Sequence, residues 1–436
     1  MKKNRSGLSL GSVLTLCLTA AVVAGCVLVF GKIRSGSPHA AMDAQRVISF
    51  VGDAFQGATP EPITDNSAVR TVTQTLPPIL EPTLAPLPTP APGTEKQQYS
   101  FSLTFGGLMA FESEISDSLY NRTDKTVDYR PVVATLGGKV CADMNLVCLP
   151  QVLNVTDQKY ADALAPASAA DAVHAVGFDD ALLCTEHILD QGAQGASDTV
   201  EALASRGVSS GGVTVGAARQ NRIVQLNGAR IAVLSYTDVL TAKGKNALAA
   251  EPYLMHLYEP DAVRQDIADA RAQGVHFVIV CMYWGKADQV AVTTAQKNTA
   301  RTLAEMGADV ILGFRPRRVL GMEMLSVMGE DGKRRQALAA YSLGTLLSES
   351  RDAGAIAGML LHLDMTVDSE GGVRFNAVEY TPTYIWRQSV NGKIQYRLLC
   401  SADPDPAGMD EKQSGIMARA LARVQAALDN SPAAQR

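Results

Sequence analysis

The chain lacks the surplus of positive charge that binding to nucleic acid requires. Its 436 residues contain 39 lysines and arginines against 44 aspartates and glutamates, which gives a net charge of −5 and a pI near 5.8. No stripe of basic residues interleaved with aromatic residues is present to neutralise phosphates and stack on bases. We therefore do not expect nucleic acid to be a partner.

The chain has few cysteines, and no two of them stand at the short spacing of a zinc site. Cys148, Cys184 and Cys281 each lie in or beside an apolar run that is typical of a β-strand. In such a place a free thiol behaves as a small hydrophobic group. The sequence therefore predicts buried thiols here.

A long apolar run extends from about Leu8 to Phe30, with basic residues on both sides. It is long enough to supply the roughly 20 residues that cross a bilayer, and it exceeds the apolar core of a cleaved signal peptide. We predict a cytoplasmic segment at residues 1–7 and an uncleaved transmembrane signal anchor at residues 8–30. Val23 to Cys26 also match a lipoprotein box, which leaves acylation of Cys26 open.

A change of composition follows the apolar run. From Thr59 to Gly93 the sequence is rich in proline and threonine and poor in large apolar residues. Such a segment buries too little surface to offset the entropy lost on ordering, and it adopts extended, polyproline-like conformations. We interpret residues 31–98 as a stalk that holds the rest of the chain outside the cytoplasm.

The segment from Tyr99 onward alternates strand-like and helix-like patterns. Helical patterns at Pro260 to Gln273 and Thr294 to Met306 each end at a glycine, as does a third at Ser197 to Arg206. This alternation predicts an α/β layered domain at residues 99–400. We expect residues 401–436 to form an amphipathic helix and a tail that dock either on the domain or on a partner. The strand-like runs before the glycine at 344 are Leu146 to Leu149, Ala181 to Cys184, Ile231 to Tyr236, Phe277 to Met282 and Val310 to Leu312.

The stretch from His187 to Leu203 is the most informative part of the chain. It contains His187, Asp190-Gln-Gly192, Gly195 and Thr199, and it resembles the signature of CapA-type capsule and poly-γ-glutamate synthesis proteins. The resemblance extends in order over residues 99–400. It implies a four-layer, metallophosphatase-like α/β sandwich, in which two mixed β-sheets are flanked by helices and metals are held at the loops after the strands.

This chain departs from the family where the metal ligands are expected. By the same resemblance, Gly107 replaces an aspartate, Tyr283 replaces a histidine, and Arg315 and Arg317 replace two more histidines. Arginine has no free lone pair with which to ligate a metal and stays protonated. We therefore expect no metal and no other cofactor.

The two arginines suggest a different use of the same place. A guanidinium group can bind a carboxylate or phosphate with two hydrogen bonds. We predict an anion-binding pocket formed by Arg315 and Arg317 with Tyr283, Trp284 and Asp190. Each assignment has a structural alternative: the two aromatic residues can pack, Asp190 can cap a turn, and the arginines can be solvated at the surface.

Two further residues beside the signature allow a catalytic interpretation. His187 can act as a general acid or base with Glu186 as its partner. Alternatively, His187 is a framework residue, and Glu186 neutralises one of the two arginines.

The sequence leaves three functions open. The first is a single-pass protein of the cell membrane whose extracytoplasmic domain assists capsule or poly-γ-glutamate synthesis or export as a non-catalytic homologue that binds an anionic polymer. The second is a hydrolase of phosphoester or γ-glutamyl bonds that uses His187. The third is a structural scaffold for a membrane synthase, whose partners are the synthase components. The role in polymer synthesis comes from the resemblance alone.

Overall fold

The computed structural model describes residues 97–435 apart from 156–159, 162, 216–220 and 402. The predicted signal anchor, and all of the predicted stalk except its last two residues, lie outside the described residues. Within the described ranges, no helix is both long and apolar enough to cross a membrane.

The larger of the two main sheets is mixed and nine-stranded. The first strand of this sheet in the chain has alternating apolar and polar residues, as expected for a β-strand. Phe101, Leu103 and Phe105 point into the core between the sheets, and the polar residues between them point to the other face. The strand order is β18 (Lys393–Cys400), β17 (Val373–Val390), β16 (Ala357–Asp368), β1 (Gln98–Met109), β4 (Met144–Cys148), β7 (Asp180–Leu182) and β8 (Ser209–Gly211), with β15 (Thr345–Leu347) on β1 and β19 (Ala434–Gln435) on β17. β1 pairs antiparallel with β16 and parallel with β4, and β4 continues parallel to β7.

The second main sheet has six strands and a parallel centre. Its middle strands are almost continuously apolar, as expected for strands that are covered on both faces. The order is β13 (Val319–Met328), β14 (Arg334–Leu343), β12 (Val310–Phe314), β11 (Phe277–Tyr283), β10 (Ala229–Thr237) and β9 (Arg222–Leu226). The four strands from β14 to β10 run parallel.

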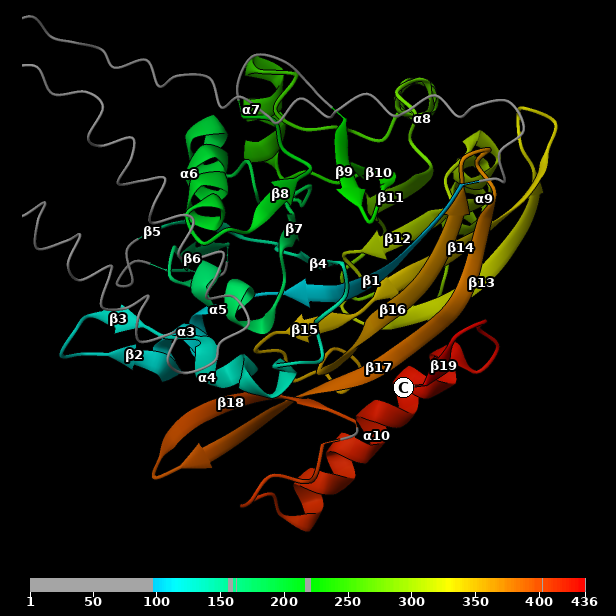
Figure 1. The fold of residues 1–436 in the computed structure, drawn as a ribbon. Coiled ribbons are helices and arrows are strands. Elements are labelled where there is room, and N and C mark those ends of the chain that lie inside the picture. The colour runs from blue at the N-terminus through cyan, green and yellow to red at the C-terminus, as the bar shows by residue number, and fades with distance from the viewer. Residues whose placement is uncertain (1–96, 156–159, 162, 216–220, 402, 436) are drawn as a thin grey trace, which may run out of the picture. The chain divides into compact units, whose positions relative to one another are not determined.

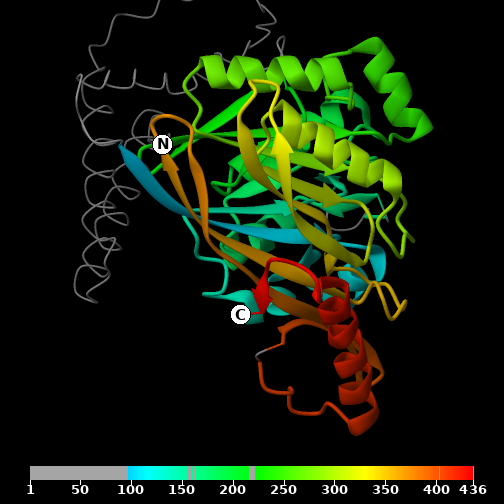
Figure 2. The same ribbon diagram turned by 90° about the vertical axis from the view of Figure 1, so that its right-hand side faces the viewer.

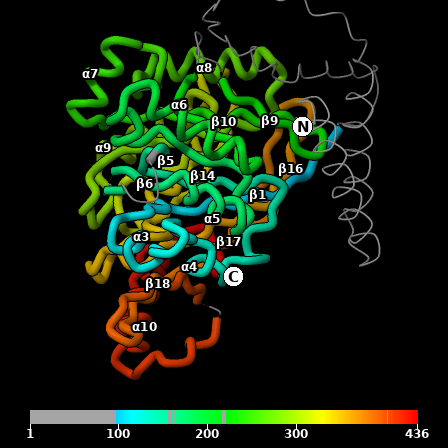
Figure 3. The backbone as a smooth tube through the Cα atoms, turned by 90° about the vertical axis from the view of Figure 1, so that its left-hand side faces the viewer, coloured from blue at the N-terminus to red at the C-terminus, as the bar shows by residue number. Residues whose placement is uncertain are grey.

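The two sheets pack face to face, and helices cover both outer faces. Apolar side chains of both sheets form one core cluster between them, with Phe105, Leu146, Ile279 and Leu312 among its most buried members. The outer face of the nine-stranded sheet is covered by α3 (Ser113–Leu119), α4 (Arg130–Val133), α5 (Ala169–Val176) and α6 (Gly192–Ala204) (Figures 1 and 3). The outer face of the other sheet is covered by α8 (Pro260–Ala272) and α9 (Thr294–Met306). The prediction of a mixed α/β fold is confirmed.

Several local predictions can be compared with the elements. The helix α9 has the predicted bounds, because Thr293 and Gln296 form a capping box at its start and Gly307, with φ of 117°, ends it. The helix α6 begins at Gly192, five residues before the predicted start at Ser197. Asn391 and Gly392 form the turn of the hairpin that joins β17 and β18, and both residues have positive φ, as an Asn-Gly turn requires.

The C-terminal helix α10 (Glu411–Leu428) belongs to the core of the domain. Its buried residues Ala420, Val424 and Leu428 join the apolar cluster between the sheets. The helix lies along β13, β16 and β17 and is drawn in red in Figure 2. The sequence left open whether this helix docks on the domain or on a partner, and the structure shows that α10 packs on the domain.

The smaller elements lie in the connections between these layers. They are β2 (Tyr120–Asn121), β3 (Thr126–Val127), η1 (Ala134–Leu136), β5 (Val152–Val155), β6 (Leu164–Pro166) and α7 (Ala242–Ala250). The helix α7 is the least embedded of the helices that border the site described below, since Gly244 is its one buried residue.

The three thiols predicted to be buried lie in the core between the sheets. Cys148, Cys184 and Cys281 are each 0% exposed. Burial raises the pKa of the Cys184 thiol to about 12, because a thiolate would lose its hydration there. This prediction is confirmed, and the three thiols are neutral, unreactive core groups at physiological pH.

Candidate functional site

The parallel strands of both sheets bring their carboxyl ends to one edge of the sandwich. Residues that follow β1, β7, β10, β11 and β12 meet at this edge. We call the cluster the strand-end site. It consists of Glu112, Glu186, His187, Asp190, Asp238, Tyr283, Arg315 and Arg317.

Arg315 forms an ion pair with Glu186 at the centre of the strand-end site. One guanidinium nitrogen donates to Glu186 Oε2 at 2.9 Å, and the other terminal nitrogen donates to the carbonyl of Gly285. The phenol of Tyr283 donates to the other oxygen of Glu186 at 3.3 Å. Burial, followed by the neighbouring carboxylate, holds the pKa of Tyr283 well above its usual value, so this residue is a neutral donor. Glu186 thus neutralises the arginine.

The backbone of Arg315 is held in an unfavourable conformation. Its φ is 94°, in the left-handed region that a residue with a side chain seldom adopts. Ser342 and Thr345 fix the loop by donating to the carbonyls of Pro316 and Arg317, each at 2.9 Å. Such strain persists where the surrounding structure over-determines the conformation. Here it places the guanidinium group against Glu186.

Arg317 forms a second ion pair, with Glu112. The distance from its guanidinium nitrogen to Glu112 Oε1 is 3.0 Å. The other carboxylate oxygen of Glu112 accepts from the Ser348 hydroxyl at 2.6 Å and from the Glu349 N–H at 2.7 Å. The side chain of Glu112 is 9% exposed, whereas that of Arg317 is 41% exposed. The carboxylate is therefore enclosed, and part of the guanidinium group still faces water.

His187 is linked to the start of α7 through Asp190. The distance from His187 Nδ1 to Asp190 Oδ2 is 2.8 Å, and the hydroxyl of Thr241 donates to the other carboxylate oxygen. Thr241 is the N-cap residue of α7 and accepts from the Gly244 N–H at 3.0 Å. The second ring nitrogen of His187 lies 4.0 Å from Glu186, and 38% of the His187 side chain is exposed. Asp190 therefore orients the imidazole and anchors the helix.

The two aromatic residues predicted to line the pocket are both buried. Tyr283 and Trp284 are each 2% exposed. Trp284 stacks on Tyr341 with ring centroids 6.1 Å apart, and its indole N–H donates to the Tyr341 carbonyl at 3.1 Å. The Trp284 ring has no open face for a sugar, so packing accounts for its presence.

The side chains at the strand ends do not fit the metal site that the resemblance implies. At Gly107 any Cβ would collide with the carbonyl oxygen of Gly344, so this backbone has no room for a carboxylate. Two of the other positions hold guanidinium groups, which do not ligate metals. Within the described residues, no group of three or more His, Cys, Asp or Glu side chains is placed to hold a metal ion.

Most of the sequence-predicted site residues come together, but two carboxylates of the site were missed. Arg315, Tyr283 and His187 lie around Glu186, while Arg317 turns to Glu112, which sequence reasoning did not select. The sequence does contain one indication of Glu112, since it is a charged residue three positions after the end of the apolar strand β1. Asp238 was also missed: it follows β10, and burial raises its pKa although the Arg315 charge acts in the opposite direction.

Comparison with known proteins identifies relatives over part of the chain. The family described as bacterial capsule synthesis protein PGA_cap matches residues 102–350. The capsule biosynthesis protein CapA of Bacillus anthracis is 26% identical over 181 residues, covering 40% of this chain and 41% of that protein. The PGA biosynthesis protein CapA of Bacillus subtilis is 29% identical over 133 residues, covering 30% and 34%. The aligned regions span less than half of either relative.

Solved structures with a similar chain path are more distant. The NAD nucleotidase NadN of Haemophilus influenzae has 12% identity and a TM-score of 0.39, with 77% of this chain and 57% of that chain covered. The calcineurin-like phosphoesterase YfkN of Bacillus subtilis has 10% identity and a TM-score of 0.35, with 76% and 99% covered.

Proposed function

Because the chain belongs to the bacterial capsule synthesis protein PGA_cap family, we propose that it assists the synthesis or export of an anionic surface polymer without catalysing a reaction at the strand ends. In this proposal residues 8–30 anchor the protein in the cell membrane and residues 31–98 hold the domain outside. The polymer class is that of the CapA relatives, whose names refer to capsule and PGA biosynthesis.

The observation that supports a non-catalytic role is the pairing of both arginines with carboxylates. Arg315 is neutralised by Glu186 and Arg317 by Glu112, at positions where the resemblance implies metal-binding histidines. A metallophosphatase mechanism needs a metal to activate water and to stabilise charge on phosphoryl oxygens. Among the residues that the structure describes, the side chains at the strand ends supply neither a metal-binding set nor a free cation in the enclosed part of the site.

Contact with an anionic polymer would use Arg317 rather than Arg315. The side chain of Arg317 is 41% exposed and that of Arg315 is 16% exposed. One terminal guanidinium nitrogen of Arg317 donates to Glu112, and the other lies 3.4 Å from the hydroxyl oxygen of Ser348. The water-facing side of the Arg317 guanidinium group can therefore also bind a carboxylate of the polymer.

Binding of poly-γ-glutamate to the purified full-length protein tests this proposal. Arg317→Gln should weaken binding several-fold and reduce its dependence on salt, because one charge-assisted contact is lost. Arg318→Gln is the matched control, since Arg318 is the adjacent arginine and pairs with the exposed Asp352. Equal losses from both variants, or none from Arg317→Gln, would refute the polymer contact and leave a scaffold for a membrane synthase as the better function.

The full-length protein also allows the membrane topology and the absence of a metal to be checked. Protease added to intact spheroplasts should release a fragment that begins in the stalk, whereas a protected domain would reverse the proposed orientation.

Elemental analysis of the full-length protein after purification without chelator should find no stoichiometric manganese, iron or zinc. One tightly held ion per chain would contradict the proposal.

One observation favours a second candidate, the hydrolase. His187 is accessible and is oriented by Asp190, which is the arrangement of a general acid or base and its partner. Hydrolysis of p-nitrophenyl phosphate or γ-glutamyl-p-nitroanilide that is abolished by His187→Ala, and reduced by Asp190→Asn, would favour this function over the non-catalytic one.

A further inference from the structure

A hollow of about 590 Å³ lies beside the strand-end site. Its lining comes from the loop after β10, from α7 and from the segment that leads into α8, and we call it the α7 cleft. Its volume falls within the range of roughly 300–1,000 Å³ that is usual for small-ligand sites. Asp238 belongs to both places, because it lines the cleft and also interacts with Arg315.

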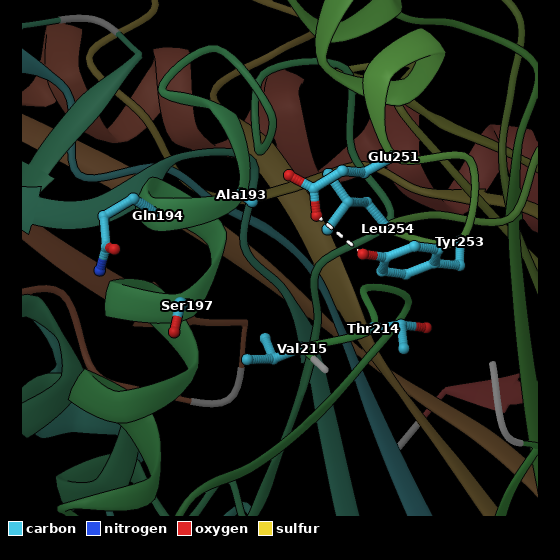
Figure 4. A pocket seen from close by; sticks show the side chains of 8 residues that line it. All are labelled: Ala193, Gln194, Ser197, Thr214, Val215, Glu251, Tyr253 and Leu254. Carbon is cyan, nitrogen blue, oxygen red and sulfur yellow. Dashed lines mark hydrogen bonds between the residues drawn. The ribbon is translucent and has the colours of Figure 1, made fainter. Parts of the chain in front are cut away.

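Most of the α7 cleft is lined by apolar side chains. Leu240 and Met255 are 9% and 2% exposed, whereas Leu257 is 40% exposed. The same segment also borders a smaller hollow of about 290 Å³, where Tyr253 and Val215 are 37% and 51% exposed (Figure 4). Large apolar side chains that remain exposed together mark sites of interaction.

Three charged side chains complete the lining of the α7 cleft. Asp238 and Glu259 are carboxylates, and Lys245 is the one cation among the lining residues. Among the described residues, none of the three forms an ion pair with another lining side chain, and the nearby Arg315 is already neutralised by Glu186. The cleft therefore offers one excess negative charge beside an apolar surface.

We propose that the α7 cleft binds the free amino end of an apolar peptide. The ammonium group of the peptide lies by Asp238 and Glu259, and its first side chain lies against Leu257 and Met255. Lys245 donates to a peptide carbonyl, which distinguishes a peptide from a simple alkylamine. An acidic polymer does not fit here, because its carboxylates would meet Asp238 and Glu259.

The wall of the α7 cleft is coupled to the strand-end site through one residue. Thr241 caps α7 and donates to Asp190, which in turn holds His187. Since Gly244 is the one buried residue of α7, this wall can adjust to an occupant at small cost in packing.

Binding is tested on the full-length protein with two probes, the tripeptide Leu-Ala-Leu amide and its N-acetylated form. Methyl-labelled methionine provides the readout, because the buried Met255 lines the cleft and its resonance is assigned from Met255→Leu. The free peptide should shift this resonance in a saturable way and bind about tenfold more tightly than the acetylated one, as expected for one charge-assisted contact.

Asp238→Asn should remove most of this tenfold difference between the two peptides. Asp364→Asn is the charge-matched control, since Asp364 is an exposed carboxylate on β16. The proposal is overturned if neither peptide shifts the Met255 resonance, if both peptides bind equally, or if the two variants behave alike. Poly-γ-glutamate binding should be unchanged by Leu257→Ser, so failure at the cleft is separable from failure of the polymer contact at Arg317.

Discussion

Arg317 and Arg318 are adjacent in the chain, yet their ion pairs are built in different surroundings. The partner of Arg317 is Glu112, which is 9% exposed and also accepts from Ser348 and Glu349. The partner of Arg318 is Asp352, which is 52% exposed. An enclosed carboxylate depends on its donors, whereas an exposed one can exchange them for water. Similar distances in the two pairs therefore correspond to different free energies.

The pair of Arg315 and Glu186 is enclosed on both sides, with side-chain exposures of 16% and 19%. It differs from the pair at Glu112 in having a second carboxylate nearby, since Asp238 also interacts with Arg315. Loss of one carboxylate here leaves the arginine partly compensated. Substitutions that remove one partner of each ion pair can therefore distinguish the contributions of the three pairs to stability.

Removal of the Glu112 carboxylate should have the largest effect on stability. Glu112→Ala leaves the Ser348 hydroxyl, the Glu349 N–H and the Arg317 guanidinium group without their acceptor. We expect the free energy of unfolding to fall by about 3 kcal/mol, the low end for a broken buried pair, because Arg317 can still reach water. Denaturant unfolding of the full-length protein measures this.

The same variant sharpens the proposed polymer contact. With Glu112 gone, Arg317 carries an uncompensated charge, so the folded protein should bind poly-γ-glutamate more tightly than the wild type. Weaker binding by folded Glu112→Ala would show that Glu112 positions Arg317 for the polymer rather than competing with it.

A smaller loss is expected when Glu186 is neutralised. Glu186→Gln keeps an acceptor for Tyr283 but removes the charge opposite Arg315. We expect a loss of about 2 kcal/mol, because the bond to Glu186 is charge-assisted and Asp238 remains as a partial counter-charge. Glu186→Gln together with Asp238→Asn should then lose more than the sum of the single losses, and strict additivity would contradict the shared role of Arg315.

Much of the fold could be predicted from the sequence because local patterns and tertiary packing agree there. The runs at Phe277 to Met282 and Val310 to Leu312 are buried strands, and the Asn391-Gly392 pair is the turn of a hairpin. The β13–β14 hairpin was not predicted, although Asp331 and Gly332 lie at its turn. The helix α7 was missed because one buried residue produces no apolar periodicity.

The site was harder to predict, because its pairing depends on residues far apart in the chain. The sequence left open which arginine Glu186 would meet, and the positive φ of Arg315 decides it by aiming that side chain inward. Glu112 lies 205 residues from Arg317, so no local spacing connects the two. Sequence reasoning identified the residue types of the cluster but not its ion pairs.

Disruption of the exposed pair should have little effect on stability. Arg318→Ala removes the partner of Asp352, whose carboxylate remains accessible to water. We expect a change of about 0.5 kcal/mol or less in the free energy of unfolding, as for other exposed ion pairs. A loss comparable with that of Glu112→Ala would show that burial does not distinguish the two neighbouring arginines.

The smallest expected effect is an acid dependence that comes from Asp352. Its pKa is lowered from the usual 3.8, first by the N–H of Gly354 and then by Arg318. A carboxyl group whose pKa is lower in the folded state contributes its full stability above its usual pKa and loses that contribution as the pH falls through the folded value. Asp352→Asn should therefore lower stability slightly at pH 6, and this loss should disappear as the pH falls through the lowered pKa of Asp352. Because the N–H of Gly354 is the largest single cause, Arg318→Ala should retain part of this acid dependence, and its complete loss in Arg318→Ala would assign the pKa shift to the ion pair instead.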